Sequence, residues 1–563
     1  MKLYEDFMNE YFSLAPLSAT YIGINDYNDK LINYYEDNEI IKYKKFLKKY
    51  ISLVNQKLKL SNTEKNKHYL NVLKYRLKMD LEGYQYNFHY LPIDSLHNTI
   101  LNWVEHCSGK SYIPLKTIKD FKNFLSRMRV YLESIDSIIN RMKDGIKNRI
   151  TQPKKVMKKV LVDLENVLKN KDYLLQDNLL NEYNSVNVND LKNDYNLVIK
   201  KLFPLQIKKL SNFIKNTYLK NCHDGFGLLA FKNGKEMYNY LVRYHTTLKN
   251  PNIPEIHNLG ITEVKRIEEN INQLFIKYKK IYPNLINPKN MKNDMKDIKD
   301  IKVREKLFYK DENDVLKSFR KLQTQIDKTV LPKYFNINDK INTKYKIKRI
   351  PKFKEKNKGG AYYQRSSYDI KRLGTFYINM GKIDQIYKCN SYSLSIHEGN
   401  PGHHFQTSYS NDMKNPLFIS FYEDETAYVE GWGLYAEYLG RQYLLSEEKE
   451  KGLLKEEQVY DLFGSYNMEM LRALRLVIDT GIHYYGWDFK KSFDYMKKYS
   501  ELGEKEMENE IYRYSLNPGQ ALAYKIGELK FKKMKEEAIK KNQNIKNFHH
   551  NILKYGSRPL WML

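Results

Sequence analysis

The sequence predicts a mainly α-helical protein with one small β-sheet beside its most informative motif. Apolar residues recur at intervals of three and four over much of the chain, which is the spacing of an amphipathic helix. Two examples are the set Tyr4, Phe7, Met8 and Tyr11 and the set Leu161, Leu164, Val167 and Leu168. No Gly/Ser-rich or Pro-rich linker interrupts the pattern, so we expect long helices joined by short loops.

The exception to the helical pattern lies between Lys344 and Asn379. Residues 345–350 alternate in polarity, the pair Gly359–Gly360 follows, and residues 376–378 (Phe-Tyr-Ile) favour a strand. We therefore expect a small sheet here, close along the chain to the motif described below.

Length alone would divide 563 residues among several domains. Because no linker is evident, we expect residues 1–563 to form a single unit with two parts. A helical part would cover residues 1–283, and a part carrying the motif would cover residues 301–563. Residues 284–300 between them are rich in Lys, Asn and Asp, which predicts a polar loop or linker.

The net charge of +29, from 96 basic and 67 acidic residues, could attract acidic substrates or membrane surfaces. The lysines are spread along the chain and no nucleic-acid-binding motif accompanies them, so no nucleic-acid partner is expected. Three scattered cysteines favour a reducing compartment over a disulfide framework. No signal peptide and no transmembrane segment is evident, which predicts a cytoplasmic protein.

The eight residues from His397 to His404, His-Glu-Gly-Asn-Pro-Gly-His-His, predict a metal site. Imidazole is the commonest metal ligand, and the adjacent Glu398 can accept a proton from an activated water. In the usual zinc-protease helix a second histidine follows four residues after the first, but here that position is Pro401. Proline inside a helix removes a backbone hydrogen bond and clashes with the preceding turn.

A break in the helix would resolve this conflict. Along a continuous helix the first and last histidines of the motif would lie about 10.5 Å apart, a long reach for two ligands of one ion. We therefore expect one helix to end near Gly399 and a second to begin at Pro401. Asn400 would be the N-cap of the second helix, and Gly402 would allow close approach of the backbone.

The identity of the second histidine ligand is left open between two neighbouring residues. The bend could bring either His403 or His404 back toward His397, and the sequence does not choose between them. A histidine-rich helix cap that binds no metal is the alternative.

A predicted helix over residues 418–445 supplies acidic side chains. Glu430 and Glu437 share one helical face, two turns apart, among apolar and aromatic residues. A carboxylate in such a setting costs free energy unless it is paired or binds a cation. Glu430 is the candidate third metal ligand, and Glu437 is the candidate acceptor for the ring N–H of a ligand histidine. Glutamates that face solvent on an amphipathic helix are the alternative.

Later residues could complete a hydrolytic site. Candidate hydrogen-bond donors to the oxyanion of a tetrahedral intermediate, which the sequence does not separate, are His483, Tyr514 and Tyr524. Candidates for two-pronged binding of a substrate carboxylate, which would favour an exopeptidase, are Arg472, Arg475 and Arg513. Structural roles are the alternative: the first two arginines could hold Asp479 or Glu469, and Gln520 and Tyr524 could simply pack.

Taken in order, these blocks resemble the domain-of-unknown-function family 885. The family motif His-Glu-x-x-Pro-Gly-His-His-x-Gln corresponds to residues 397–406, and matching blocks extend over nearly the whole chain. The other blocks are residues 372–379, 430–437, 472–483, 513–514, 517–527 and 548–553. The resemblance implies a gluzincin-like zinc metallopeptidase core, within which the small sheet would lie beside the motif helix.

We therefore predict a zinc-dependent hydrolase, a metallopeptidase that acts on a peptide or small amide substrate. The ligands of Zn²⁺ would be His397, Glu430 and either His403 or His404. Glu398 would act as general base and then deliver the proton to the leaving amine. Two other classes remain open: a catalytically inactive scaffold of the same fold and, less favoured, a polyanion-binding protein. The oligomeric state is not predicted.

Overall fold

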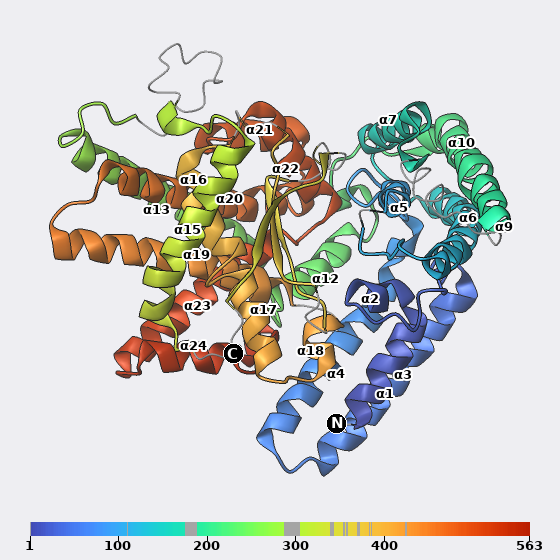
Figure 1. Cartoon of the computed structure of the whole chain (residues 1–563), viewed down its shortest axis with the longest axis horizontal. Coiled ribbons are helices and arrows are strands. Elements are labelled where there is room, and N and C mark those ends of the chain that lie inside the picture. Colours follow the sequence, from blue (N-terminus) through green and yellow to red (C-terminus); the bar gives the residue numbers. More distant parts are fainter. Residues whose placement is uncertain are drawn as a thin grey trace. The chain divides into compact units, whose positions relative to one another are not determined.

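The structure is a computed structural model. It describes residues 2–563 apart from residues 110, 175–187, 287–304, 338–342, 353–354, 356–358, 369–371, 382, 384–385 and 423–424. Helices dominate it and one small sheet accompanies them, which confirms the predicted fold class (Figure 1). Within the part that is described, no helix is both long and apolar enough to cross a membrane.

The chain folds into two compact units. The first comprises Met1–Phe226 and Ala230–Lys232, and the second comprises Gly227–Leu229 and Asn233–Leu563. The change of unit near residue 230 differs from the predicted division at residues 284–300, most of which lie outside the described residues. The reason is helix α13 (Ile253–Lys279), which packs along α20 (Glu456–His483) and therefore belongs with the motif.

The first unit consists of helices packed on one another. The apolar set predicted near its start, from Tyr4 to Tyr11, is buried as expected. Arg127 is fully buried and donates hydrogen bonds to Thr20 Oγ1 and the carbonyl of Tyr27. Its α-helices are α1 (Lys2–Leu14), α2 (Pro16–Tyr21), α3 (Asp37–Leu60), α4 (Glu64–Gly83), α5 (Thr99–Cys107), α6 (Ile118–Asn148), α7 (Lys154–Asn170), α9 (Val188–Tyr195), α10 (Phe203–Phe213) and α11 (Leu219–Asn221).

The second unit holds the sheet and all the predicted site residues. The helix that carries His397 packs against both α19 and α20, which places the motif in the middle of this unit. Besides α13 and α20, its helices are α12 (Gly234–Thr246), α15 (Glu312–Tyr334), α16 (Lys388–Glu398), α17 (His403–Asp412), α18 (Leu417–Phe421), α19 (Thr426–Lys451), α21 (Phe489–Tyr499), α22 (Glu504–Leu516), α23 (Leu522–Lys540) and α24 (Ile545–Leu553).

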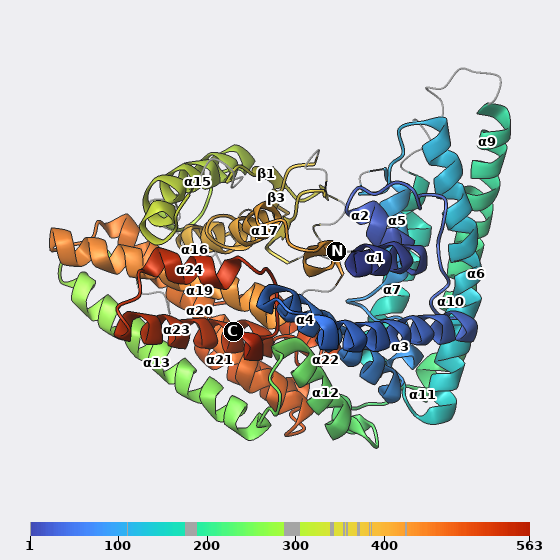
Figure 2. The same cartoon turned by 90° about the horizontal axis from the view of Figure 1, so that it is seen from below.

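The predicted sheet lies where the alternating segment indicated, beside the motif helices (Figure 2). Its strands are β1 (Lys346–Arg349), β2 (Ala361–Gln364) and β3 (Thr375–Ile378), in the order β1-β3-β2. β3 runs parallel to β1 and antiparallel to β2. Ile347, Phe376 and Ile378 pack with Phe319 of α15 and Leu394 of α16, so the sheet is anchored to the helix that ends at the motif.

Candidate metal centre

The helix breaks within the motif, as predicted. α16 ends at Glu398 and α17 begins at His403, with four residues between them. The turn is tight: Gly402 N donates to the carbonyl of Ile396 at 3.0 Å. A Cβ atom at Gly402 would lie 2.0 Å from the carbonyl oxygen of His397, so only glycine permits this approach. The bend therefore depends on a residue without a side chain.

The predicted role of Asn400 is wrong. The second helix begins two residues later than Pro401, and its N-cap is Gly402. The Asn400 side chain instead donates to Asp327 Oδ1 of α15 at 2.7 Å and to the carbonyl of Thr343 at 3.0 Å. Its amide nitrogen holds the break against α15 and the segment before β1, and the residue lies too early in the chain to cap α17, whose N-cap is Gly402.

Three side chains of the motif and of α19 converge. His397 Nε2 lies 3.5 Å and His403 Nε2 lies 3.4 Å from the same oxygen, Glu430 Oε2. One ligand atom of each residue lies within 4.8 Å of those of the other two. Gly433, one turn after Glu430, makes room for the His397 ring, because a Cβ there would lie 2.5 Å from Cε1. The structure therefore brings together two imidazole nitrogens and one carboxylate, from two separate segments.

His404 turns away from this group and toward the sheet. Its Nδ1 lies 2.9 Å from the hydroxyl of Tyr363 in β2, and its ring packs against Tyr345. Successive residues at the start of a helix point about 100° apart, so only one of the two histidines can face His397. The structure selects His403 as the second histidine of the group.

Glu437 accepts a hydrogen bond from the first histidine, as predicted. His397 Nδ1 lies 2.7 Å from Glu437 Oε1, and Ser393 donates to the other carboxylate oxygen. Burial raises the pKa of Glu437, but Arg472 and His397 outweigh it and keep the pKa below its usual value. An ionised Glu437 fixes the proton of His397 on Nδ1, which leaves the lone pair on Nε2 directed at the group.

The electrostatics favour a positive charge between these residues. Burial lowers the pKa of His397, but the carboxylates of Glu430 and Glu437 outweigh it and raise the pKa to about 10. Burial also opposes ionisation of Glu430, yet His397 and His403 hold its pKa well below the usual range. Without a metal, a proton on His397 supplies the balancing charge. A divalent cation can take the place of that proton, because metal binding requires the neutral imidazole.

The donor set fits Zn²⁺. Two imidazole nitrogens and one carboxylate oxygen are a known catalytic zinc set that leaves a fourth position open. The Glu437 contact to His397 is the carboxylate–histidine pairing that orients such ligands. Glu398, the residue after the first histidine, is 7% exposed and accepts no hydrogen bond from any described residue. Its carboxylate is therefore available as a base beside the group.

Both ring nitrogens of His483 form hydrogen bonds with backbone groups. Leu228 N donates to its Nδ1 at 3.1 Å, and its Nε2 donates to the carbonyl of Tyr514 at 3.0 Å. Burial lowers its pKa to about 4, so the ring stays neutral. With both nitrogens occupied, the ring has no donor left for an oxyanion, and its geometry is that of a packing residue between segments.

Two of the predicted arginines meet the predicted tyrosines around a residue that sequence reasoning missed, Glu510. Arg475 Nη2 and Tyr514 Oη both donate to Glu510 Oε2, at 2.9 and 2.7 Å. Burial raises the pKa of Glu510, but Arg475 and Arg513 outweigh it and lower the pKa to about 2. Its position three residues before Arg513 on α22 was the one available signal.

Arg513 and Tyr524 form the open side of this cluster. Arg513 Nη2 donates to the hydroxyl of Tyr524 and to Gln520 Oε1, each at 3.0 Å. The Arg513 side chain is 27% exposed, whereas that of Arg475 is 5% exposed. Because Tyr524 accepts from Arg513, its own hydroxyl proton remains to be donated, and no described residue receives it.

Arg472 and Arg475 do contact buried acids, as the structural alternative expected, but the acids are Glu437 and Glu510 and not Asp479 or Glu469. Arg472 lies 4.0 Å from Glu437, the partner of His397, and so contributes to orienting that histidine. Asp479 instead accepts from Tyr238 and from the backbone of Gly519. Ser393 was also missed; it lies four residues before His397, on the same helical face.

Comparison with known proteins identifies relatives of undetermined function. The profile of a family described as a bacterial protein of unknown function (DUF885) matches residues 16–563. A candidate lipoprotein from Colwellia psychrerythraea has the same fold, with a TM-score of 0.84 and 19% identity over 100% of this chain and 97% of that one. A candidate lipoprotein of unknown function from Shewanella oneidensis has a TM-score of 0.72 and 17% identity over 100% and 98% of the two chains. No functionally curated protein matches the sequence.

Proposed function

We propose that this protein, which belongs to the DUF885 family of bacterial proteins of unknown function, is a zinc-dependent metallopeptidase with a gluzincin-like core. The observation that carries the proposal is the convergence of His397 Nε2 and His403 Nε2 on Glu430 Oε2. These three side chains would hold the ion. When bound there, Zn²⁺ supplies Lewis-acid chemistry, which polarises an amide carbonyl and makes a water molecule more acidic.

The protein side of the reaction rests on Glu398. Its carboxylate, beside the first histidine, would take a proton from the attacking water and deliver it to the leaving amine nitrogen. Glu437 would hold the ring of His397 through Nδ1, and Arg472 would keep Glu437 ionised. These residues give a base and a fixed ligand.

Tyr524 and Arg513 would contact the substrate. Of the three predicted oxyanion donors, Tyr524 is the one whose hydroxyl proton is not received by another described residue. Arg513 is the most exposed of the three predicted arginines, which suits binding of a substrate carboxylate. We propose a peptide or a small amide as substrate; binding of its carboxylate by Arg513 would favour exopeptidase action.

Metal content tests the proposal. Protein purified without added metal should contain about one zinc per chain, measured by mass spectrometry. His397→Ala, His403→Ala and Glu430→Gln should lose the ion. His404→Ala is the matched control, because it removes the neighbouring imidazole that faces the sheet, and it should keep the ion. A wild-type protein that neither contains zinc nor takes it up on titration would overturn the proposal.

The location belongs to the proposal as well. We retain the cytoplasm predicted from the sequence. Both structural neighbours are described as candidate lipoproteins, so attachment to a membrane through a lipid is the competing possibility. Fractionation of the natural host cells decides between them. Protein in the cytosolic fraction supports the prediction, and protein that leaves the membrane fraction only with detergent contradicts it.

A further inference from the structure

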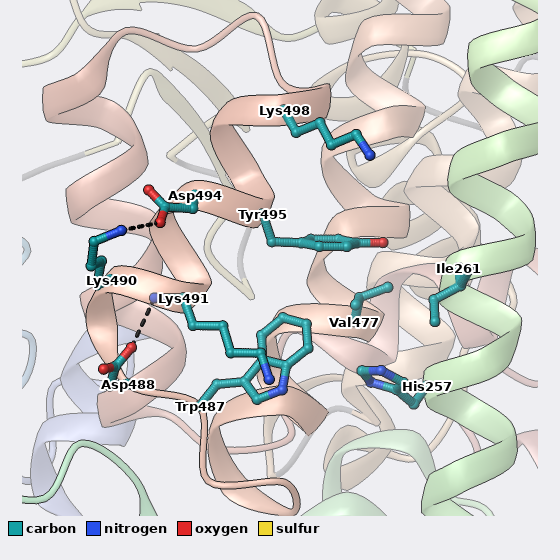
Figure 3. Close-up of a pocket in the computed structure, with 10 residues that line it drawn as sticks. All are labelled: His257, Ile261, Val477, Trp487, Asp488, Lys490, Lys491, Asp494, Tyr495 and Lys498. Carbon is teal, nitrogen blue, oxygen red and sulfur yellow. Dashed lines mark hydrogen bonds and ion pairs between the residues drawn. The ribbon is translucent and has the colours of Figure 1, made fainter.

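A hollow in the second unit has no part in the proposed reaction. It is walled by α13, α20 and α21 (Figure 3). Its volume of about 570 Å³ is typical of sites for small molecules. Residues from all three helices and from the turn before α21 line it. They are His257, Ile261, Val477, Trp487, Asp488, Lys490, Lys491, Asp494, Tyr495 and Lys498.

The floor of the hollow is apolar and aromatic. Val477 is fully buried at its base, with Ile261 on one side and the rings of Trp487 and Tyr495 on the other. The indole of Trp487 is fixed in place, because it lies where Gly481 has no side chain: a Cβ there would be 2.5 Å from its Cδ2. A rigid indole beside a tyrosine ring offers a flat surface to a planar ligand.

The rim carries positive charge that the chain does not neutralise. Asp494 pairs with Lys490 at 2.5 Å, and Asp488 Oδ1 accepts from the backbone N of Lys491 as the N-cap of α21. Lys490 therefore balances Asp494, Asp488 keeps its charge at the helix N-terminus, and the three lysines of the rim outnumber its two aspartates by one. Lys491 and Lys498 have no carboxylate partner among the described residues, and the Lys491 ammonium lies 4.7 Å from the centre of the Trp487 ring.

His257 adds a polar contact without charge. Thr480 Oγ1 donates to the carbonyl of Leu476 at 2.6 Å, so His257 Nδ1, 2.7 Å from Thr480 Oγ1, must be the donor of that pair. Burial lowers the pKa of His257, which keeps the ring neutral. The cationic character of the hollow therefore comes from the two free lysines alone.

We propose that this hollow binds a small carboxylate whose body is a planar aromatic group. The ring would lie on the apolar floor against Trp487, and the carboxylate would face Lys491 and Lys498. The apolar surface supplies affinity, whereas the two ammonium groups select the anion over a neutral molecule of the same shape. This site stands apart from the proposed zinc chemistry and does not depend on it.

Fluorine NMR of the full chain labelled with 5-fluorotryptophan tests the proposal. The sequence has four tryptophans, so four resonances are expected, and Trp487→Phe identifies that of residue 487. Titration with 2-naphthoate should shift the Trp487 resonance saturably and leave the other three in place. The neutral analogue 2-naphthamide should bind more weakly. Lys491→Gln and Lys498→Gln should each weaken naphthoate binding by roughly fivefold, the equivalent of about 1 kcal/mol per exposed ion pair.

Lys497→Gln is the matched control, since Lys497 is a neighbouring exposed lysine of α21 that pairs with Glu504 and does not line the hollow. It should leave the affinity unchanged. Absence of a saturable shift at millimolar naphthoate would overturn the proposal. Equal affinity for the acid and the amide, or equal losses in all three lysine variants, would also overturn it, because either result means that the two rim lysines do not recognise the carboxylate.

Discussion

Two groups of buried or partly buried acidic side chains in the second unit balance their charge in different ways. In the first, which we call the Lys525 cluster, the ammonium of Lys525 is fully buried. It lies 2.6 Å from Glu469, 2.7 Å from Glu528 and 2.9 Å from Glu263. Arg441 and Arg266 add two further cations to Glu469, at 2.7 and 2.5 Å. The chain itself supplies the positive charge, so the Lys525 cluster is complete without a ligand.

At the candidate metal centre the described chain supplies no permanent cation to Glu430. Its close basic partners among the described residues are His397 and His403, and an imidazole is cationic only when protonated. The difference between the two groups shows that buried carboxylates alone do not indicate a metal site. The indicative feature is a buried carboxylate whose partners can give up their protons to a metal ion.

Replacement of the proposed general base should have the largest effect, a loss of catalytic turnover. Glu398→Gln keeps the size of the side chain but removes its ability to accept a proton. We expect turnover of the best peptide found in a library to fall by about 100- to 10,000-fold, the usual contribution of a general base. Zinc content should not change, since Glu398 is not among the three converging ligands. A variant that keeps full activity would remove Glu398 from the mechanism.

A substitution in the Lys525 cluster should instead lower the stability of the fold and leave zinc binding unchanged. Lys525→Met removes the fully buried cation and leaves Glu528 with only the longer contact to Lys532, at 3.8 Å, among the described residues, which should lower the free energy of unfolding by about 3–5 kcal/mol. Zinc content of the folded protein should stay at the wild-type level. Urea unfolding followed by circular dichroism measures the loss. Lys505→Met, which breaks an exposed pair with Glu508, should cost no more than about 1 kcal/mol. Equal losses of unfolding free energy in the two variants would contradict the distinction between the buried Lys525 cluster and an exposed ion pair.

The sequence contained enough to predict the helices, the small sheet and the break in the motif. Apolar spacing is local information, and so is the conflict between Pro401 and a continuous helix. Gly402 was expected to allow close approach, and it does so next to the carbonyl of His397. Glu430 and Glu437 could be proposed because carboxylates in an apolar helix need a partner.

The remaining features depend on contacts between distant segments. The choice of His403 over His404 is made by Tyr363 and Tyr345, which approach from the sheet. The true role of Asn400 follows from Asp327, 73 residues earlier in the chain. No local pattern distinguishes a helix N-cap from an asparagine that bridges to another helix, so this prediction could not have been made from the sequence.

The hydrogen bond between Glu437 and His397 gives another test of the difference between the candidate metal centre and the Lys525 cluster, with a smaller expected effect. Glu437→Gln keeps a hydrogen-bond acceptor but removes the charge that fixes the proton on Nδ1. Zinc affinity should fall by about 10- to 100-fold, the usual effect of removing such a partner. Competition with a chromogenic chelator measures it. Glu528→Gln, the matched change in the Lys525 cluster, should leave zinc affinity unchanged, and an equal loss there would mean that the effect is not specific to the metal centre.

Asp479 represents a third way to balance a buried carboxylate, namely by a proton. It is fully buried, and its hydrogen bonds come from Tyr238 and the backbone of Gly519. No lysine or arginine of the described chain forms an ion pair with it. Burial raises its pKa from 3.8 to about 7, although these two donors lower it in part.

The raised pKa fixes the sign of a pH dependence. The folded state holds the proton more tightly than the unfolded chain, so the stabilisation is complete below about pH 4 and is lost as the pH rises through 7. Asp479→Asn mimics the protonated form at every pH. Its unfolding free energy relative to wild type should therefore rise by about 2 kcal/mol from pH 5 to pH 7. Urea unfolding at the two pH values measures the difference. Asp494→Asn, at an exposed carboxyl, should run parallel to wild type. If Asp479→Asn also runs parallel, then Asp479 is ionised in the folded state, and the contrast with the Lys525 cluster fails at this position.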